Sequence, residues 1–286
     1  MNAVAEPVTK QQVKKMFPPR PAWSHKGQSG KLLIIGGSMR YSGSPAFAAL
    51  AAIRTGADLT LVAAPRRAAD IIASMKPDLI TEPMACDYVC PSAVKHLLGL
   101  AEWADAVVIG GGLDRKEETY AAIRLFLEKY GKSGKPCVLD AEALRAVSRH
   151  PQLLKANYML TPHEKEFVAI GGEKPVMELK QRVQQAKGLA VRLKTTIVLK
   201  GHVDVISDGK QAMINRTGNP YMTKGGTGDT LAGICGALAA RGVRPFDAAC
   251  AAAWINGTAG DKALKNIGPG FLVSEMLDFI PKAIWG

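Results

Sequence analysis

The chain alternates short apolar, β-prone runs with longer stretches of helical periodicity over most of its 286 residues. The runs that predict strands contain few polar residues and lie at 31–35, 59–63, 106–109, 137–140, 158–160 and 196–200. Helical patterns lie between them, at 44–55, 66–75, 92–101, 117–130, 164–170 and 177–192. Because this order with apolar strands is typical of a parallel sheet covered on both faces, we predict an α/β fold with a mainly parallel central sheet.

The pattern changes after residue 203. Asp208-Gly209 separates two short runs, 203–207 and 211–215, which predicts a β-hairpin with a two-residue turn. Two stretches rich in Ala and Gly follow, at 230–240 and 246–264, and predict a closely packed helix pair. Since no long linker or repeat divides the chain, we expect one domain over residues 23–286. An N-terminal arm, residues 1–22, precedes it, and the sequence leaves its mobility open.

Composition favours a globular protein, with 47% hydrophobic and 22% charged residues. The net charge of +12 predicts attraction to polyanions. Its basic residues are scattered and form no run interleaved with aromatics, so we expect phosphorylated small molecules rather than nucleic acid as partners.

Five cysteines without a CxxC pair favour free thiols in a reducing compartment, and therefore a cytoplasmic protein. The N-terminus has no apolar signal segment. Arg54 and Asp58 interrupt the apolar run at 45–65, so we expect no membrane span.

The segment Gly225-Gly226-Thr227-Gly228-Asp229 carries the most chemical information. Glycine permits a tight backbone whose N–H groups converge, and a helical pattern follows directly, so the segment predicts an anion site suited to phosphate. A carboxylate on its rim can take a proton from a substrate hydroxyl while the amides hold the phosphoryl group. The plainer alternative is a helix start with Asp229 as a first-turn charge. The preceding Gly218-Asn-Pro and the small-residue helix favour the phosphate site.

Two glycine motifs follow predicted strands, where open parallel sheets bind ligands. In the first, residues 36–45, Ser44 is a good helix N-cap and Pro45 suits the first helical position, so a ligand loop and an ordinary strand-to-helix turn are equally compatible. In the second, three glycines ending at Gly112 suggest a backbone that passes close to a bulky group. They lack the GxGxxG spacing of a dinucleotide fold.

Three polar motifs follow the later strands. After 158–160, His163 is placed to bind a ligand, and Glu166 either orients a water of a bound Mg²⁺ or closes a capping box. After 196–200, a lysine is placed to neutralise phosphate and a glycine to bend around a nucleotide, or the lysine is a surface residue; this segment reads Lys200-Gly201-His202-Val203-Asp204. Asp140 faces the same rim or caps a helix.

Together these motifs resemble the ribokinase-like superfamily, and within it the ADP-dependent NAD(P)H-hydrate dehydratases. The resemblance covers roughly residue 31 to the C-terminus, and its pieces are Tyr41-Ser-Gly-Ser-Pro45, Val108-Ile-Gly-Gly-Gly-Leu113, Val138-Leu-Asp-Ala-Glu-Ala-Leu144, Leu160-Thr-Pro-His163, Val198-Leu-Lys-Gly-His202 and Gly218-Asn-Pro-Tyr-Met-Thr-Lys-Gly-Gly-Thr-Gly-Asp229. The Gly-Asn-Pro-x-Met prefix is typical of the dehydratases, whereas sugar and pyridoxal kinases share only Gly-x-Gly-Asp. Tyr221 departs from the family pattern, where a second glycine is common, and Glu-Lys after His163 replaces the frequent Pro-Gly.

The resemblance implies that hydrated NADH or NADPH (NADHX or NADPHX) is converted to the intact cofactor while ADP is consumed to AMP and phosphate, with Mg²⁺. Asp229 would be the catalytic base. The hydrate would contact Ser44, Pro45, Gly112, His163 and Asp229. ADP would contact residues 200–204 and the loop formed by Gly225, Gly226, Thr227 and Gly228.

The resemblance also favours a homo-oligomer, with a tetramer among the candidate states. Some relatives carry an N-terminal epimerase domain that this sequence lacks, so we expect no epimerisation. The alternatives are a vitamin or sugar kinase that uses ATP, suggested by Gly-Gly-Thr-Gly-Asp alone, and a nucleotide sensor without catalytic activity.

Overall fold

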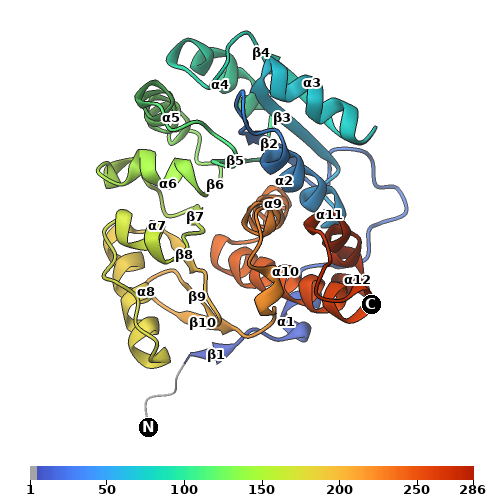
Figure 1. Ribbon diagram of the computed structural model, residues 1–286, viewed down its shortest axis with the longest axis vertical. Coiled ribbons are helices and arrows are strands. Elements are labelled where there is room, and N and C mark those ends of the chain that lie inside the picture. Colours follow the sequence, from blue (N-terminus) through green and yellow to red (C-terminus); the bar gives the residue numbers. More distant parts are fainter. Residues whose placement is uncertain (1–4) are drawn as a thin grey trace.

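The computed structural model describes residues 5–286 and is built on a ten-stranded sheet with helices on both faces (Figure 1). The strand order is β1-β10-β9-β8-β7-β6-β5-β2-β3-β4. The strands β2 to β8 run parallel, and β9 is antiparallel to both of its neighbours. Their bounds are β1 Glu6–Pro7, β2 Lys31–Ile35, β3 Leu59–Pro65, β4 Ile80–Met84, β5 Ala106–Ile109, β6 Cys137–Leu139, β7 Tyr158–Leu160, β8 Thr196–Leu199, β9 Asp204–Ser207 and β10 Ala212–Asn215. The predicted α/β fold with a mainly parallel sheet is confirmed.

The helices divide between the two faces because neighbouring residues of a strand point in opposite directions. Leu32 and Ile34 of β2 pack under one set of helices, and Leu33 and Ile35 under the other. The first set is α1 Lys10–Lys14, α2 Gly43–Arg54, α3 Arg66–Met75, α9 Thr227–Ala240, α10 Pro245–Ile267, α11 Val273–Met276 and α12 Ile280–Trp285. The second set is α4 Val94–Trp103, α5 Glu117–Tyr130, α6 Glu142–Val147, α7 Glu164–Ala169 and α8 Leu179–Leu193.

The chain order places a ligand-binding crevice between β2 and β5. From β2 the sheet grows through β3 to β4, and it then continues on the other side of β2 with β5. The loops after β2 and β5 therefore leave the sheet in opposite directions, and the crevice between them is where doubly wound sheets bind ligands. The two glycine motifs of the sequence, residues 36–45 and 110–112, lie at these strand ends.

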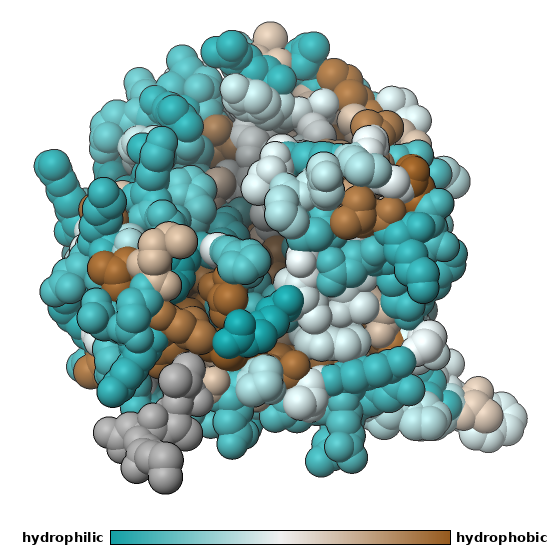
Figure 2. Space-filling view, turned by 60° about the horizontal axis from the view of Figure 1, so that its bottom comes forward, coloured by the Kyte–Doolittle hydropathy of each residue, from teal (hydrophilic) through white to brown (hydrophobic). Residues whose placement is uncertain are grey.

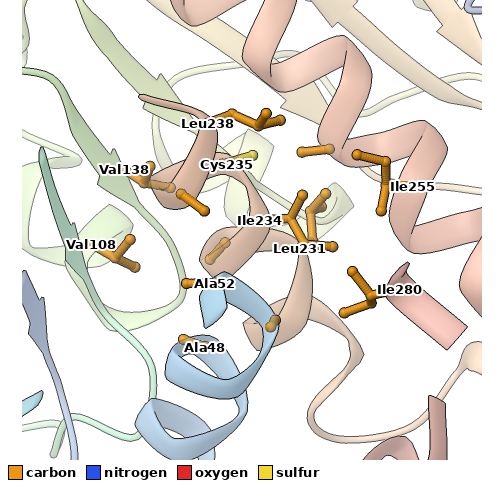
Figure 3. Close-up of a cluster of buried hydrophobic side chains, with 14 of the residues drawn as sticks. Ala48, Ala52, Val108, Val138, Leu231, Ile234, Cys235, Leu238, Ile255 and Ile280 are labelled. Atoms are coloured by element: carbon orange, nitrogen blue, oxygen red, sulfur yellow. The ribbon is translucent and has the colours of Figure 1, made fainter. Parts of the chain in front are cut away.

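Helix α9 is buried between the sheet and two other helices (Figure 3). Ala48 and Ala52 of α2, Val108 and Val138 of the sheet, and Ile255 of α10 surround its apolar side chains. Its small residues allow this closeness, since a Cβ on Gly233 would fall on the carbonyl oxygen of Ala48. The predicted packed pair of Ala- and Gly-rich helices, α9 and α10, is confirmed, and the packing fixes the position at which α9 begins.

The predicted two-residue hairpin turn is wrong, because Ser207 pairs with Ala212 and leaves four residues in the turn. Asp208 accepts hydrogen bonds from the backbone N–H groups of Lys210 and Gln211, at 2.9 Å each, which closes the wider loop. Gly209 adopts a φ of +89°, as a glycine in such a turn can.

Two strands were not predicted from the sequence. The edge strand β4 contains Thr81, Glu82 and Pro83, which weaken the apolar pattern, and proline is tolerated there because an edge strand needs fewer donors. The strand β1 is only two residues long and lies in the proposed N-terminal arm, where it pairs with β10.

The described part of the N-terminal arm packs on the rest of the chain. After β1, Thr9 caps α1, whose Val13 is 1% exposed within the core, and Lys10 donates a 2.6 Å hydrogen bond to the carbonyl of Gly286. The division at residue 22 stays a prediction. No helix within residues 5–286 combines the length and apolarity needed to cross a bilayer. The face in Figure 2 is mostly hydrophilic, with apolar side chains in smaller patches and a recess near its middle.

Candidate active site

A cavity of about 850 Å³ lies beyond the carboxyl ends of the central strands. Five loops reach it from the sheet, and each carries a residue singled out in the sequence: Ser44 after β2, Gly112 after β5, Asp140 after β6, His163 after β7 and Lys200 after β8. The glycine-rich segment at the start of α9 closes it from the opposite side. The structure therefore brings together residues that are almost two hundred positions apart in the chain.

Most of the predicted site residues line this cavity: Ser44, Gly112, His163, Glu166, Lys200, Gly201, His202, Asp204, Gly225, Gly226, Thr227, Gly228 and Asp229. Two do not. Pro45 is buried in the first turn of α2, and Val203 packs against the core cluster on the other face of the sheet. Their proposed ligand contacts stay predictions.

The start of α9 forms a cradle of unused amide groups. Gly226 has a φ of +105°, a conformation that brings the chain sharply into the helix at Thr227. Within residues 5–286, no acceptor is found for the N–H groups of Gly225, Gly226, Gly228 and Asp229. Such amides at the positive end of a 14-residue helix bind phosphate oxygens.

Asp229 stands in the first turn of α9, close to the backbone of the loop after β5. A Cβ on Gly111 would lie only 2.6 Å from Asp229 Oδ1, so this approach requires glycine at position 111. Burial and the negative charge of Asp140 raise the pKa of Asp229 to about 7, against the opposing effects of a Ser44 hydrogen bond and Lys200. A half-buried carboxyl with a pKa near neutrality is suited to general base catalysis.

Lys200 forms an ion pair with Asp140, with its Nζ 3.0 Å from Asp140 Oδ1. Asp140 is 4% exposed and also accepts a 2.7 Å hydrogen bond from the Thr161 hydroxyl. Burial opposes the charge on Lys200, but attraction from Asp140, Glu166 and Asp229 raises its pKa, so it is an ammonium ion. Asp140 is thus an ion-pair partner at the rim, and Ala141 is the residue that precedes α6.

His163 and Glu166 form the capping box that the sequence allowed. His163 Nδ1 accepts from the backbone N–H groups of Lys165 and Glu166, at 3.1 and 3.2 Å, and Glu166 Oε2 accepts from the His163 N–H at 2.9 Å. Glu166 Oε2 also lies 3.8 Å from Lys200 Nζ. The box therefore fixes both side chains at the wall of the cavity.

The turn after β8 is held from behind by a buried arginine. Arg182 is 7% exposed and donates a 3.0 Å hydrogen bond to the Lys200 carbonyl, and a Cβ on Gly201 would collide with its guanidinium group. Asp204 accepts hydrogen bonds at 3.0 Å from the Gly201 N–H and the Asn215 amide. Burial raises the pKa of Asp204, and these contacts oppose that rise.

The remaining wall, residues 217–224, was not assigned from the sequence beyond its Gly-Asn-Pro motif. Asp261 of α10 holds it, with Oδ2 accepting from the Gly218 N–H at 2.9 Å and Oδ1 from the Asn219 amide at 3.0 Å. Asn256 of the same helix lines the cavity and donates a 3.2 Å hydrogen bond to the Thr227 carbonyl. The available signal was Asn256, a polar residue within the run of small and apolar residues that α10 buries.

This mainly parallel sheet, with a carboxylate beside a glycine-rich loop at its carboxyl edge, has the ribokinase-like fold. The chain belongs to the NAD(P)H-hydrate dehydratase family, whose model matches residues 32–282.

Individual relatives agree with this assignment. The bifunctional NAD(P)H-hydrate repair enzyme Nnr of Methanothermobacter thermautotrophicus is 41% identical over 270 residues, which cover 94% of this chain and 52% of the relative. The chain thus spans about half the length of that protein. The ADP-dependent (S)-NAD(P)H-hydrate dehydratase of Cenarchaeum symbiosum is 35% identical, over 95% of this chain and 94% of the relative. The ADP/ATP-dependent NAD(P)H-hydrate dehydratase of Bacillus subtilis, crystallised with ATP and Mg²⁺, is similar with a TM-score of 0.80 and 29% identity, over 99% and 98% of the two chains.

Proposed function

We propose that this chain dehydrates NADHX and NADPHX to NADH and NADPH and consumes ADP to AMP and phosphate. Family membership and the names of the relatives from Cenarchaeum symbiosum and Bacillus subtilis support the reaction class. The observation that carries the proposal is the position of Asp229, a carboxyl with a pKa of about 7 that borders the amide cradle in one cavity with Lys200.

The proposed reaction has two stages. Asp229 removes the proton of the hydrate's hydroxyl group. The hydroxyl oxygen then bonds to the β-phosphorus of ADP, while the bond between that phosphorus and the oxygen that bridges to the α-phosphate breaks and AMP is released. The carbon–oxygen bond of the phosphorylated hydrate then breaks. Phosphate leaves with the bonding electrons, a neighbouring carbon loses a proton, and the ring double bond is restored.

The other residues have binding roles in this proposal. The free amide groups of Gly225, Gly226 and Gly228 and the ammonium of Lys200 neutralise the β-phosphate. Residues 201–204 and the Thr227 side of the loop hold the rest of the nucleotide. The hydrate lies against Ser44, Pro45, Gly112 and His163. Ser44 also stabilises the Asp229 carboxylate, which opposes the rise of its pKa.

Mg²⁺ fits this site as a companion of the nucleotide. Residues 5–286 contain no group of three or more His, Cys, Asp or Glu side chains that would hold a metal alone. Mg²⁺ usually keeps several waters and binds substrate phosphates with one or two carboxylates, so the absence of an all-protein cage is compatible with it. When bound, it would neutralise phosphate charge, and Glu166 would accept a hydrogen bond from one of its waters.

We further propose a cytoplasmic homo-oligomer, with a tetramer among the candidate states. All five cysteines are free, in keeping with a reducing compartment. Trp23 is 90% exposed and Trp285 55% exposed, which supports contacts between copies of the chain. Light scattering during size-exclusion chromatography tests the oligomer, and a mass equal to that of one chain would contradict it.

The activity is tested with purified protein and enzymatically hydrated NADH, to which ADP, ATP and Mg²⁺ are added in turn. Regeneration of the absorbance of the reduced nicotinamide is expected with ADP, together with equal amounts of AMP and phosphate. Asp229→Asn should nearly abolish turnover and keep ADP binding. Absence of regeneration with every nucleotide would refute the proposal, and a stable phosphorylated product from a vitamin or sugar would identify a kinase instead.

A further inference from the structure

Three carboxylates surround one ammonium group at the inner end of the cavity. Lys200 Nζ lies 3.0 Å from Asp140 Oδ1 and 3.8 Å from Glu166 Oε2. It is also near the start of α9, because a Cβ on Gly228, the residue before Asp229, would lie 3.4 Å from it. A lysine ammonium has three donors on a flexible stem, so any of the three carboxylates is a candidate partner.

Asp140 is held as a stationary partner for this ammonium. Its Oδ1 accepts from both Lys200 and the fully buried Thr161 hydroxyl. The Asp140 backbone N–H donates to the Ile109 carbonyl at 3.0 Å, and a Cβ on Gly110 would fall on the Asp140 carbonyl oxygen. These contacts fix the Asp140 backbone, and the Thr161 hydrogen bond orients the carboxylate that binds the Lys200 ammonium.

The partner chosen by Lys200 matters for Asp229. An ammonium bound to Asp229 would stabilise the anion and occupy the oxygen that must accept the substrate proton. With Lys200 on Asp140, Asp229 has no ion-pair partner within residues 5–286, and Ser44 stabilises its anion. The other titratable groups that line the cavity are His163, Glu164, Glu166, His202, Asp204 and Lys224. His163 Nε2 lies 3.3 Å from Glu166 Oε1.

We propose that Asp140 is a positioning residue that holds the Lys200 ammonium away from Asp229 and so keeps the Asp229 carboxylate unpaired and basic. It acts through Lys200 and touches neither the hydrate nor its hydroxyl group. This inference rests on the proposed function for the identity of the proton donor, and its electrostatic part holds without that function.

The main test is the pH dependence of kcat/KM for Asp140→Asn. Without the Asp140 carboxylate, Lys200 is expected to pair with Asp229. The loss of the Asp140 negative charge and the new ion pair each stabilise the Asp229 anion. The midpoint of the acid limb of the kcat/KM profile should therefore move to lower pH by about one unit. The paired base is weaker, so kcat on the plateau should fall at least about tenfold. Asp247→Asn, a carboxyl exchange on α10 outside the cavity, is the matched control and should leave the limb in place.

A double variant separates action through Lys200 from a direct charge effect. Lys200→Met alone removes a cation and should move the limb up. If the two charges act on Asp229 independently, the shift of Asp140→Asn/Lys200→Met equals the sum of the two single shifts. Because no ammonium can move to Asp229 in the double variant, the inference predicts a limb at higher pH than that sum. Additive shifts would overturn the inference.

Carbon-13 NMR of the aspartate carboxyl groups measures the titration midpoint of Asp229 without turnover. The Asp229→Asn variant identifies which resonance belongs to Asp229. The Asp229 midpoint should move down in Asp140→Asn and up in Lys200→Met, and in the double variant it should lie above the sum of the two shifts. Unmoved midpoints would overturn the inference even in an active dehydratase. Shifted midpoints in a protein that turns over no hydrate would refute the proposed function and leave the inference standing.

Discussion

Replacing Gly111 by alanine should damage catalysis while leaving the fold and nucleotide binding largely intact. The added Cβ would lie 2.6 Å from Asp229 Oδ1, whereas Cβ atoms in proteins essentially never come closer than 3.0 Å and have ordinary contacts from 3.4 Å. Gly111 does not have a positive φ, so alanine is compatible with its backbone. The substitution therefore tests the close contact with the Asp229 carboxylate, and a looser one with the Ser44 Cβ at 3.2 Å, rather than backbone strain.

The size of the effect follows from the displacement. The Asp229 carboxylate must retreat by about 0.4 to 0.8 Å, and a misplacement of about 1 Å in a reacting group costs on the order of a hundredfold in rate. With the logarithm of the rate scaled to this displacement, we expect kcat in the ADP-dependent hydrate assay to fall by about 6- to 40-fold. Because residues 225–228 and Lys200 are unchanged, the Kd for ADP should change less than about threefold.

The assay needs a control for the general effect of replacing a glycine. Gly99 lies in α4, and a Cβ added there meets no atom within 4 Å, so Gly99→Ala should keep full activity and gain up to about 1 kcal/mol of stability. Full activity in Gly111→Ala, with ADP binding intact, would mean that Asp229 does not need its present position. The assignment of Asp229 as the base would then be refuted.

Three further predictions concern the charge, the packing and the wall of the site. The pKa of about 7 for Asp229 means that the base is protonated below neutrality, so kcat/KM should rise with pH through about 7; a rate that is flat from pH 5 to 8 would contradict this. Gly233→Ala places a methyl group on the Ala48 carbonyl oxygen and should lower the free energy of unfolding by about 1–3 kcal/mol. In urea titrations, an unchanged unfolding midpoint would argue against the close contact between α2 and α9. Asp261→Ala removes both hydrogen bonds that hold residues 218 and 219 and should raise the KM for ADP about tenfold, with a smaller change in kcat. A fall in kcat as large as the fall in kcat/KM would show instead that this wall acts in the chemical step.

Most strands of the sheet were predictable because their positions along the chain depend on local patterns. Apolar runs such as Ala106–Ile109 and Tyr158–Leu160 are short, buried on both faces and bounded by glycine or proline, so their positions and the parallel class follow from the sequence. The edge strand β4 was missed because an edge tolerates Glu82 and Pro83, which the pattern of a central strand excludes. The turn at 208–211 was misjudged because Asp-Gly is compatible with several loop lengths, and the pairing of Ser207 with Ala212 decides among them.

The site was predictable only as a set of loops. Glycine motifs at strand ends mark where a backbone approaches a ligand, and most of them indeed line one cavity. The role of Asp140 was open because a cap and an ion-pair partner look alike in sequence, and its partner Lys200 lies 60 residues away. Asp261 was missed for the same reason, since it acts on Gly218 from a helix 43 residues further along the chain.

The position of Asp229 explains why the glycine motif alone does not separate a dehydratase from a kinase. Both reactions begin when a carboxylate removes the proton of an alcohol and the oxygen bonds to a phosphorus held by main-chain amides, so both need the geometry of Asp229 and residues 225–228. They differ in what happens next, because phosphate on a carbon beside a ring nitrogen can leave with the help of the nitrogen lone pair, whereas phosphate on a sugar or vitamin alcohol stays. The distinction therefore depends on which alcohol is bound against Ser44, Gly112 and His163. Substitutions at these three positions should change the range of substrates, and substitutions at Asp229 should stop all of them.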